Sequence, residues 1–400
     1  MSTVKSGRLI LAAILAILVY GMIAAMLGTL LPNLSARFGL TPEQSGNIAF
    51  AQALGLIIAS VSIGPLIDNK GKKTGLLLGL TLIAVALFLL PSSGGYAHLI
   101  AWMFLLGLGG GMIVTAANAL VSDLNEARRA STLNLLNLFF GLGGLLTPLV
   151  AGNLLSGNVI AMCYVVAVLT AATLLIHALT AMPKPTGERG FKLSEVGLVT
   201  GNPALYLLSL MLFLYVACEV GVWNWLAKHL TAQGIPESQA LTILSLGFAL
   251  GMLVGRVVVS RILIRISSQN VTLGASVLMA ATTYLTLQTK DPSVAWVTVF
   301  CAGLAMAPVF PTTLAMAGDA FPKATATAMG IVITFGWVGL AVSSKIIGGI
   351  AGGDDQRLGT ALLVLPGFSV LMILVNLALR PVLAAAKARR QSLEAQNRSR

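Results

Sequence analysis

Twelve long apolar stretches, separated by short polar turns, account for most of this chain of 400 residues. Each holds roughly 20 residues, the length that an α-helix needs to cross the hydrocarbon core of a bilayer. The first stretch is too long, and too poor in a small-residue cleavage site, to be a removable signal peptide. The pattern predicts an all-α membrane protein with twelve transmembrane helices, at residues 9–31, 45–67, 73–91, 97–121, 131–155, 159–182, 203–229, 238–262, 271–289, 293–319, 324–349 and 359–380.

The composition supports this prediction. The chain is 57% hydrophobic and only 10% charged, with a mean hydropathy of +0.91, whereas soluble proteins are about a quarter charged. A soluble fold of this length could not bury so much apolar surface, so a soluble protein is excluded.

The net charge of +12 would suit a nucleic-acid-binding protein, but the basic residues are distributed as in a membrane protein. With the N-terminus placed inside, 20 of the 25 basic residues, Arg256 among them, fall at the cytoplasmic face. This asymmetry follows the positive-inside rule. It predicts a multi-pass protein of the cytoplasmic (inner) membrane, with both termini in the cytoplasm and no nucleic-acid partner. The five basic residues elsewhere are Arg37, Lys228, Lys290, Lys345 and Arg357.

Weak internal similarity divides the chain into two halves. Gly107-Leu108 matches Gly303-Leu304, and Asp123 matches Asp319, each at an offset of 196 residues. A shared offset indicates two parallel repeats of six spans. A basic tail follows the last span, and we expect it to bind anionic lipid headgroups. The predicted organisation is an N-terminal six-helix bundle at 1–182, a cytoplasmic linker at 183–202, a C-terminal six-helix bundle at 203–382 and the basic cytoplasmic tail at 383–400.

The turn between the second and third spans carries a spaced set of glycines, one acid and several basic residues. It resembles the signature Gly-x-x-x-Asp-Arg-x-Gly-Arg/Lys-Arg/Lys of the major facilitator superfamily of transporters, with Asn69 in place of the Arg. The matching residues are Gly64, Asp68, Gly71, Lys72 and Lys73. The resemblance implies two six-helix bundles that open a central site to one side of the membrane at a time.

We expect this turn to act as a conformational latch. Asp68 can pair with basic groups or cap the N-terminus of a neighbouring helix, where a carboxylate is favoured by about 0.3–1 kcal/mol. Such a contact would hold the two bundles in the outward-open state. Alternatively, the basic residues of the turn only set the topology.

Glu219 is the deepest carboxylate in the chain, near the middle of the seventh span. Charged groups in a membrane are costly and usually face a cavity or a partner. We interpret Glu219 as a substrate ligand or as the coupling site for a proton or another cation; the alternative is a structural carboxylate satisfied by a neighbour. Lys345, in the eleventh span, is a second coupling candidate. It either pairs with Glu219 or extends its amine toward the outer surface.

Polar and aromatic residues in the spans suit a polyol substrate. Tryptophan offers flat apolar faces to sugar C–H groups, and amides both donate and accept hydrogen bonds. Trp at a membrane interface is also ordinary. With Glu219, the predicted substrate-binding residues are Gln52, Asn118, Asn134, Asn137, Trp223, Asn224, Thr312 and Trp337.

Four segments resemble the fucose–galactose–proton symporters and their sodium-linked glucose relatives: Thr115–Asn118, Asn137–Pro148, Tyr215–Leu226 and Pro308–Thr312. The resemblance implies uptake of a hexose-type sugar coupled to protons or sodium. Two acids of that group are missing here, at Leu27-Gly28-Thr29 and at Val114. Glu219 is thus the only deep carboxylate, and coupling through it, through sodium, or none at all (a uniporter) remain open.

Two other function classes are considered. Gly144 to Gly152 partly resembles the span-five pattern of antiporters, which would export a drug-like or lipid-like molecule. A membrane receptor that transports nothing is a further alternative, against which Glu219 argues. The histidines and cysteines show no nucleophile or metal-ligand spacing. We therefore expect no enzyme, no metal site and no cofactor beyond a coupling ion, and a monomer whose partners are a small solute and the lipid bilayer.

Overall fold

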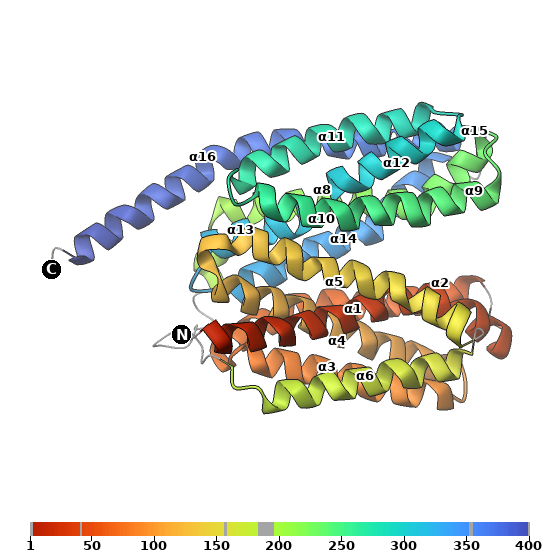
Figure 1. Cartoon of the computed structure of the whole chain (residues 1–400), viewed down its shortest axis with the longest axis horizontal. Helices are drawn as coiled ribbons and strands as arrows, with labels where there is room; N and C mark the ends of the chain where they lie inside the picture. Colours follow the sequence, from red (N-terminus) through yellow and green to blue (C-terminus); the bar gives the residue numbers. More distant parts are fainter. Residues whose placement is uncertain (1–2, 41, 156–157, 183–195, 352–354, 399–400) are drawn as a thin grey trace. The chain divides into compact units, whose positions relative to one another are not determined.

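The structure is a computed structural model that describes residues 3–40, 42–155, 158–182, 196–351 and 355–398. The regular elements in this part of the chain are all helices (Figure 1). Twelve of its helical segments are long and apolar enough to cross a membrane. This confirms the all-α prediction and the number of spans, whose ends differ from the predicted ones by up to eight residues.

The first structural unit comprises Met1–Leu193 together with the distant segment Lys323–Thr334. Within it, α2 packs against α4, α1 against α5, and α3 against both α4 and α6. Its elements are α1 (Thr3–Phe38), α2 (Pro42–Lys70), α3 (Lys72–Leu89), η1 (Leu90–Ser92), α4 (Tyr96–Leu124), η2 (Glu126–Arg128), α5 (Arg129–Leu149), η3 (Val150–Leu154) and α6 (Val159–Leu179).

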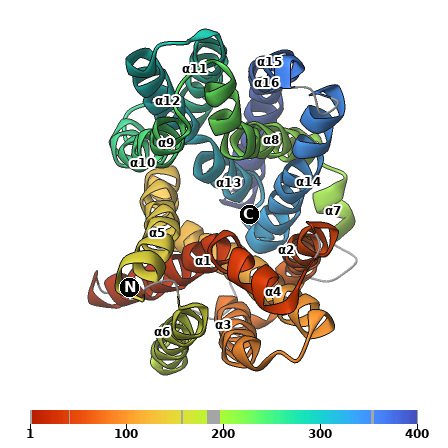
Figure 2. The same ribbon diagram turned by 90° about the vertical axis from the view of Figure 1, so that its right-hand side faces the viewer.

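The second unit comprises Ser194–Pro322 and Phe335–Arg400. Here α10 packs against α12, α11 against α12 and α16, and α8 against α16. Viewed along their axes, the helices of each unit lie side by side (Figure 2). The elements are α7 (Val196–Thr200), α8 (Pro203–Ala232), α9 (Glu237–Thr242), η5 (Ile243–Phe248), α10 (Ala249–Ile262), α11 (Ser268–Gln288), α12 (Pro292–Met306), α13 (Val309–Ala320), α14 (Thr325–Ala351), α15 (Asp355–Leu362) and α16 (Val364–Arg398).

The unit boundary falls inside α14, between Thr334 and Phe335. The first turns of this helix pack with the first unit, although in sequence they belong to the second half. Of the predicted linker 183–202, residues 183–195 lie outside the described part, and α7 follows them. Of the predicted tail 383–400, the backbone continues α16 as far as Arg398.

Several predicted spans are irregular helices, and the eighth and tenth are examples. The eighth contains a π-helical turn, η5, between α9 and α10. The tenth is interrupted at Pro308, which separates α12 from α13. Proline has no N–H to continue the hydrogen-bond ladder, and its ring crowds the preceding turn. Both interruptions fall within spans that the hydrophobic pattern alone presents as continuous.

The two units repeat one helix contact at the offset found in the sequence. A Cβ atom added to Gly107 of α4 would collide with the carbonyl oxygen of Gln52, and one added to Gly303 of α12 would collide with that of Phe248. Both glycines therefore let two helix backbones touch. Residues 107 and 303, and likewise 52 and 248, are 196 positions apart, so the internal repeat holds at the level of individual contacts.

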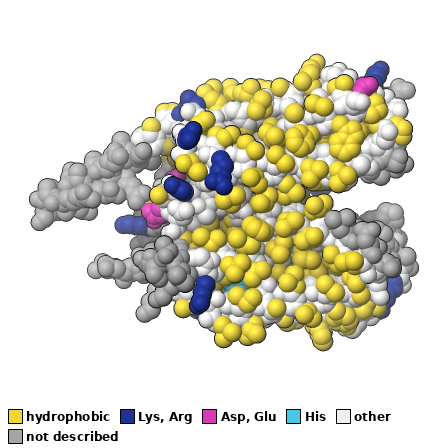
Figure 3. Space-filling model, in the orientation of Figure 1, with side chains coloured by type: hydrophobic (Ala, Val, Ile, Leu, Met, Phe, Trp, Pro, Cys, Tyr) yellow, Lys and Arg dark blue, Asp and Glu magenta, His cyan; other side chains and the backbone are white. Residues whose placement is uncertain are grey.

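The surface fits a membrane environment. On the face shown in Figure 3, hydrophobic side chains cover the middle of each unit, and Lys and Arg side chains gather toward the helix ends. Large apolar side chains such as Phe88 (63% exposed) and Val168 (69% exposed) point outward. Contact of such apolar groups with lipid tails is favourable, whereas their exposure to water raises the free energy of the folded protein.

Gly71 makes the tight turn between α2 and α3. Its φ is 95° and its ψ is 154°, a conformation that is nearly restricted to glycine. Its N–H donates to the Ile67 carbonyl at 2.8 Å and its carbonyl accepts from Thr74 at 3.1 Å, so it ends one helix and begins the next.

Replacing Gly71 with Ala should lower the free energy of unfolding by about 1–3 kcal/mol, because a Cβ is strained at this backbone conformation. Gly274→Ala is the control, since Gly274 lies in α11 with no atom within 4 Å of an added Cβ. That variant should be neutral or slightly stabilising. Thermal unfolding of both variants in detergent tests this, and equal stabilities would contradict it.

Candidate functional site

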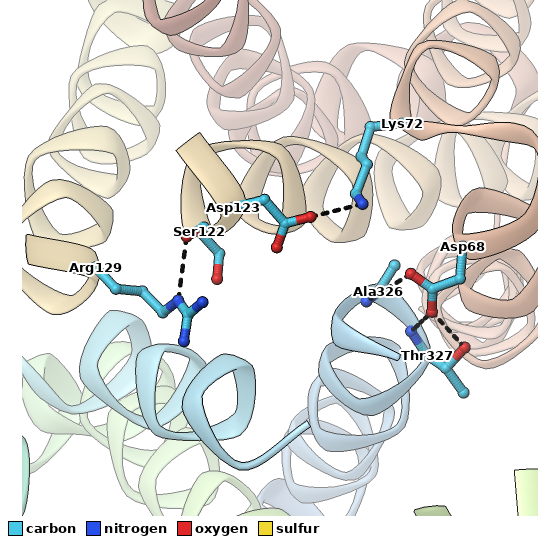
Figure 4. Close-up of polar contacts among 7 residues, drawn as sticks. All are labelled: Asp68, Lys72, Ser122, Asp123, Arg129, Ala326 and Thr327. Atoms are coloured by element: carbon cyan, nitrogen blue, oxygen red, sulfur yellow. Dashed lines mark hydrogen bonds and ion pairs between the residues drawn. The ribbon is translucent and has the colours of Figure 1, made fainter. Parts of the chain in front are cut away.

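Asp68, in the last turn of α2, caps the N-terminus of α14 (Figure 4). Its Oδ1 accepts a hydrogen bond from the backbone N–H of Ala326 at 3.2 Å. Its Oδ2 accepts from the N–H of Thr327 at 2.8 Å and from the Thr327 hydroxyl at 2.7 Å. The carboxylate is 9% exposed. It thus satisfies donors that have no partner within their own helix and lies at the positive end of the helix dipole.

Gly64, one turn before Asp68, allows this close approach. A Cβ at position 64 would lie 2.5 Å from the Cα of Thr327 and 2.9 Å from the Ala326 carbonyl oxygen. Backbone atoms cannot move aside as a flexible side chain can. The glycine and the acid of the signature therefore serve one contact, between α2 and the first turn of α14.

The basic residues of the turn bind other helix ends in the first unit. Lys72, at the start of α3, forms an ion pair of 2.6 Å with Asp123 near the end of α4. Lys73 donates to the carbonyls of Ala178 at 2.7 Å and Thr180 at 3.0 Å, at the C-terminus of α6. A cation is favoured at that end of a helix. Besides any role in topology, both lysines tie neighbouring helices together.

Two of the residues with polar contacts in Figure 4, Thr327 and Arg129, were not identified as site residues from the sequence. Arg129, the first residue of α5, is only 4% exposed, and its Nε donates to the Ser122 carbonyl at 3.1 Å (Figure 4). A threonine at a helix start is a common capping signal and could have indicated Thr327. A basic residue beside a predicted turn gives no such signal, because most are exposed.

Four of the predicted substrate-binding residues lie in the first unit, and all are buried. Asn137 of α5 donates to the Asn118 Oδ1 of α4 at 2.9 Å, so the structure joins these two amides across helices. Each also donates to a backbone carbonyl of its own helix. Asn134 donates to the Ala130 carbonyl at 2.9 Å. Gln52 lies on α2, at the close contact with α4.

The other predicted residues lie in the second unit. Trp223 of α8 is 39% exposed and packs edge to face on Phe248, with ring centroids 5.1 Å apart. Asn224 is exposed, Trp337 is half-buried and Thr312 is fully buried. Lys345 is exposed.

Glu219 is half-buried on α8 and has two polar neighbours that the sequence did not suggest. One is Tyr215, a turn earlier on the same helix; the other is Arg256 of α10. The positive charge that acts on Glu219 comes from Arg256. Lys345, for which pairing with Glu219 and extension toward the outer surface were both considered, is exposed. Arg256 is 4% exposed. The distribution of charges along the chain does not reveal this burial, because it cannot show which basic side chains turn inward.

The described residues contain no group of three or more His, Cys, Asp or Glu side chains suited to a metal ion. In the same part of the chain, the cysteines are free thiols.

The sequence model of the Major Facilitator Superfamily matches residues 13–395 of the chain. The glucose/mannose transporter GlcP of Bacillus subtilis is 25% identical over 346 residues, covering 82% of this chain and 84% of that protein. The E. coli fucose:proton symporter superimposes with a TM-score of 0.80 at 17% identity, over 92% of this chain and 98% of that one. The human organic anion transporter MFSD10 has the same score and identity, over 94% of this chain and all of that one. The two structures show the fold.

Replacing Asp68 with Asn should lower the free energy of unfolding by about 1–3 kcal/mol. The amide has one acceptor oxygen, and its NH₂ group would face the donors at the start of α14. Asn69→Ala is the control, because Asn69 is the exposed next residue. Thermal unfolding in detergent measures both, and an Asp68→Asn variant as stable as the control would contradict the capping role.

Lys72 and Asp123 should show a coupling energy of about 1 kcal/mol in a double-mutant cycle of Ala substitutions. Their side chains are 9% and 19% exposed, so the pair is better shielded from solvent than an ordinary surface ion pair. The control cycle pairs Asp123 with the exposed Lys70. A coupling energy no larger in the first cycle than in the second would contradict a specific ion pair.

Proposed function

The chain belongs to the major facilitator superfamily of membrane transporters, and we propose that it carries a hexose-type sugar by alternating access, coupled to a proton or to sodium. The observation that carries the proposal is Glu219, a half-buried carboxylate deep in an apolar helix of the second unit. A charged group in that position is costly, and such groups usually face a cavity or a partner and mark the path of a solute or an ion.

The buried amides support a neutral, hydroxyl-rich substrate. A sugar hydroxyl both donates and accepts, and Asn and Gln side chains offer both functions. Asn118, Asn137, Asn134 and Gln52 supply such groups in the first unit. In the second unit, Trp223 and Trp337 supply aromatic faces on which sugar C–H groups can pack. The B. subtilis relative and the E. coli structural neighbour are transporters of glucose/mannose and of fucose, which supports the same substrate class.

Arg256 favours one further candidate substrate, an organic anion. A buried guanidinium is a strong ligand for carboxylate or phosphate groups. The structural neighbour MFSD10 is an organic anion transporter. Transport of an anion, and export in place of uptake, are thus the alternatives that a substrate panel must separate from sugar uptake.

The orientation and assembly are part of the same proposal. We propose that the multi-pass protein lies in the cytoplasmic membrane as a monomer, with both termini in the cytoplasm, because most basic residues follow the positive-inside distribution. The basic C-terminal tail would lie near anionic lipid headgroups. In this orientation the Asp68 cap is on the cytoplasmic side, where it would stabilise the outward-open state.

Purified protein in liposomes should exchange labelled glucose, galactose, mannose or fucose in a saturable counterflow assay. Glu219→Gln should abolish accumulation against a gradient, whereas Glu126→Gln, a matched change at an exposed residue of η2, should not alter it. Exchange without accumulation in the wild type would indicate a uniporter. Saturable exchange of anions with no exchange of sugars would refute the sugar assignment and favour the anion.

A further inference from the structure

Trp223 and Phe248 form an aromatic pair within the second unit, between α8 and the π-helical turn η5. Their ring centroids are 5.1 Å apart and their planes are inclined at 84°, which is the edge-to-face geometry that aromatic rings favour. Phe248 is 0% exposed, whereas Trp223 is 39% exposed. The accessible surface of the pair is therefore the indole, and the phenyl ring supports it from the interior.

Trp223 lies on the same face of α8 as Glu219. The two residues are four positions apart in one continuous helix, so their side chains are one turn apart on one side. Glu219 is the half-buried carboxylate on which the proposed function rests. A flat apolar ring close to a polar group is typical of a site for a small ligand. The exposed indole therefore belongs to the face of α8 that the proposed function assigns to the solute.

Contacts with α12 hold Phe248 in place. A Cβ atom added to Gly303 of α12 would collide with the carbonyl oxygen of Phe248. One added to Gly247, the preceding residue of η5, would lie 3.3 Å from the ring of Trp296, also on α12. Two successive residues of η5 are thus packed against α12, and in so dense a contact neither has room to shift toward that helix. The Phe248 ring has a fixed base from which to contact Trp223.

The π-helical turn accompanies an insertion relative to the first unit. Pro42-Glu43, at the start of α2, matches Pro236-Glu237 at an offset of 194 residues. At the last residue of η5 the offset is 196, since Phe248 corresponds to Gln52. The second unit therefore has two more residues in this stretch, where α2 is a regular α-helix. A π-helical turn accommodates an additional residue within a helix, and such turns are frequent at functional sites.

The two units carry different chemistry at this repeated position. In both, the carbonyl of the residue touches a glycine of the facing helix, so the backbones correspond. The side chain is an amide at Gln52 and a phenyl ring at Phe248. The first unit thus offers hydrogen bonds where the second offers an aromatic surface. A sugar presents both kinds of complementary group, its hydroxyls and its C–H faces.

We propose, on the basis of the proposed transport function, that Phe248 is a positioning residue that holds the Trp223 indole in one orientation, against which the C–H face of the sugar ring stacks. Hydroxyl groups that point to a face of the ring interrupt its C–H surface, and a fixed indole meets that surface in one orientation only. A sugar with a continuous C–H face is therefore bound most tightly, because the indole is already ordered before the sugar arrives.

Counterflow in liposomes tests the positioning role. Phe248→Leu should raise the half-saturation concentration of the exchanged sugar about 2- to 10-fold, the range expected for loss of one aromatic pair, and should lower the maximal rate less. Phe248→Met should restore part of the affinity, because a methionine sulfur also contacts aromatic rings favourably.

Phe88→Leu is the matched control for this experiment. Phe88 also forms an edge-to-face pair, with Tyr164, and both of these side chains are exposed on the surface of the first unit. An unchanged half-saturation concentration in Phe248→Leu, or an equal rise in Phe88→Leu, would contradict the positioning role.

A double-mutant cycle tests whether Phe248 acts through Trp223. Trp223→Leu should raise the half-saturation concentration at least as much as Phe248→Leu does. Adding Phe248→Leu to Trp223→Leu should then change it by less than about 2-fold, because the ring that Phe248 positions is gone. Effects of the two substitutions that multiply would show that Phe248 acts independently of the indole, and would overturn the proposal.

Fluorine NMR of protein labelled with 5-fluorotryptophan separates the positioning role from the proposed function. The chain has five tryptophans, and the Trp223 signal is the one lost in Trp223→Phe. Phe248→Leu and added sugar should each shift this signal, and Phe88→Leu should not. If no sugar is exchanged but Phe248→Leu shifts the signal, the sugar assignment fails and the positioning contact stands. If sugars are exchanged and neither change shifts the signal, the positioning role fails alone.

Discussion

The cap that Asp68 places on α14 is the interaction on which the architecture of the first unit depends. Three donors from one helix turn converge on a single carboxylate, two of them at 2.8 Å or less. Charge-assisted hydrogen bonds of this kind are about twice as strong as neutral ones. The contact brings a segment more than 250 residues away in sequence into the first unit. Gly64 provides the room for it, and Gly71 ends the helix that presents it.

The all-α fold was largely predictable from the sequence, because the bilayer imposes a simple rule. A span needs about 20 apolar residues, and backbone polar groups in lipid must be satisfied within the helix. Irregularities inside the spans were not predictable in the same way. The π-helical turn η5 and the break at Pro308 occur in segments as apolar as their neighbours. They depend on contacts between helices, which hydropathy does not measure.

The candidate site was predictable in part. Asp68 matched a spaced signature, and the expectation of a helix cap agrees with the geometry found. Glu219 was conspicuous because it interrupts an apolar run. Arg256 was not, because it lies near a helix end that carries other basic residues, and only burial distinguishes it from them. Tyr215 was also overlooked, since a tyrosine in a span is ordinary and its significance comes from the residue one turn away.

Glu219 has a phenol, Tyr215, and a guanidinium, Arg256, among its described neighbours. The chain lacks the two acids of the fucose-type group that its span segments otherwise resemble. Coupling through Glu219 would therefore need one acid where the fucose-type group uses two. Its positively charged neighbour, Arg256, lies in the same unit.

The long sequence separation of the Asp68 cap has a consequence for biosynthesis. Asp68 and Ala326 are 258 residues apart, and ribosomes add about 5–20 residues per second. Roughly 10–50 seconds therefore pass between synthesis of the carboxylate and synthesis of its partners. During that time Asp68 lacks the hydrogen-bond donors of α14 that it accepts from in the folded protein. The first unit cannot form its final contacts until the eleventh span has been synthesised. Folding of the first unit is therefore completed late in synthesis.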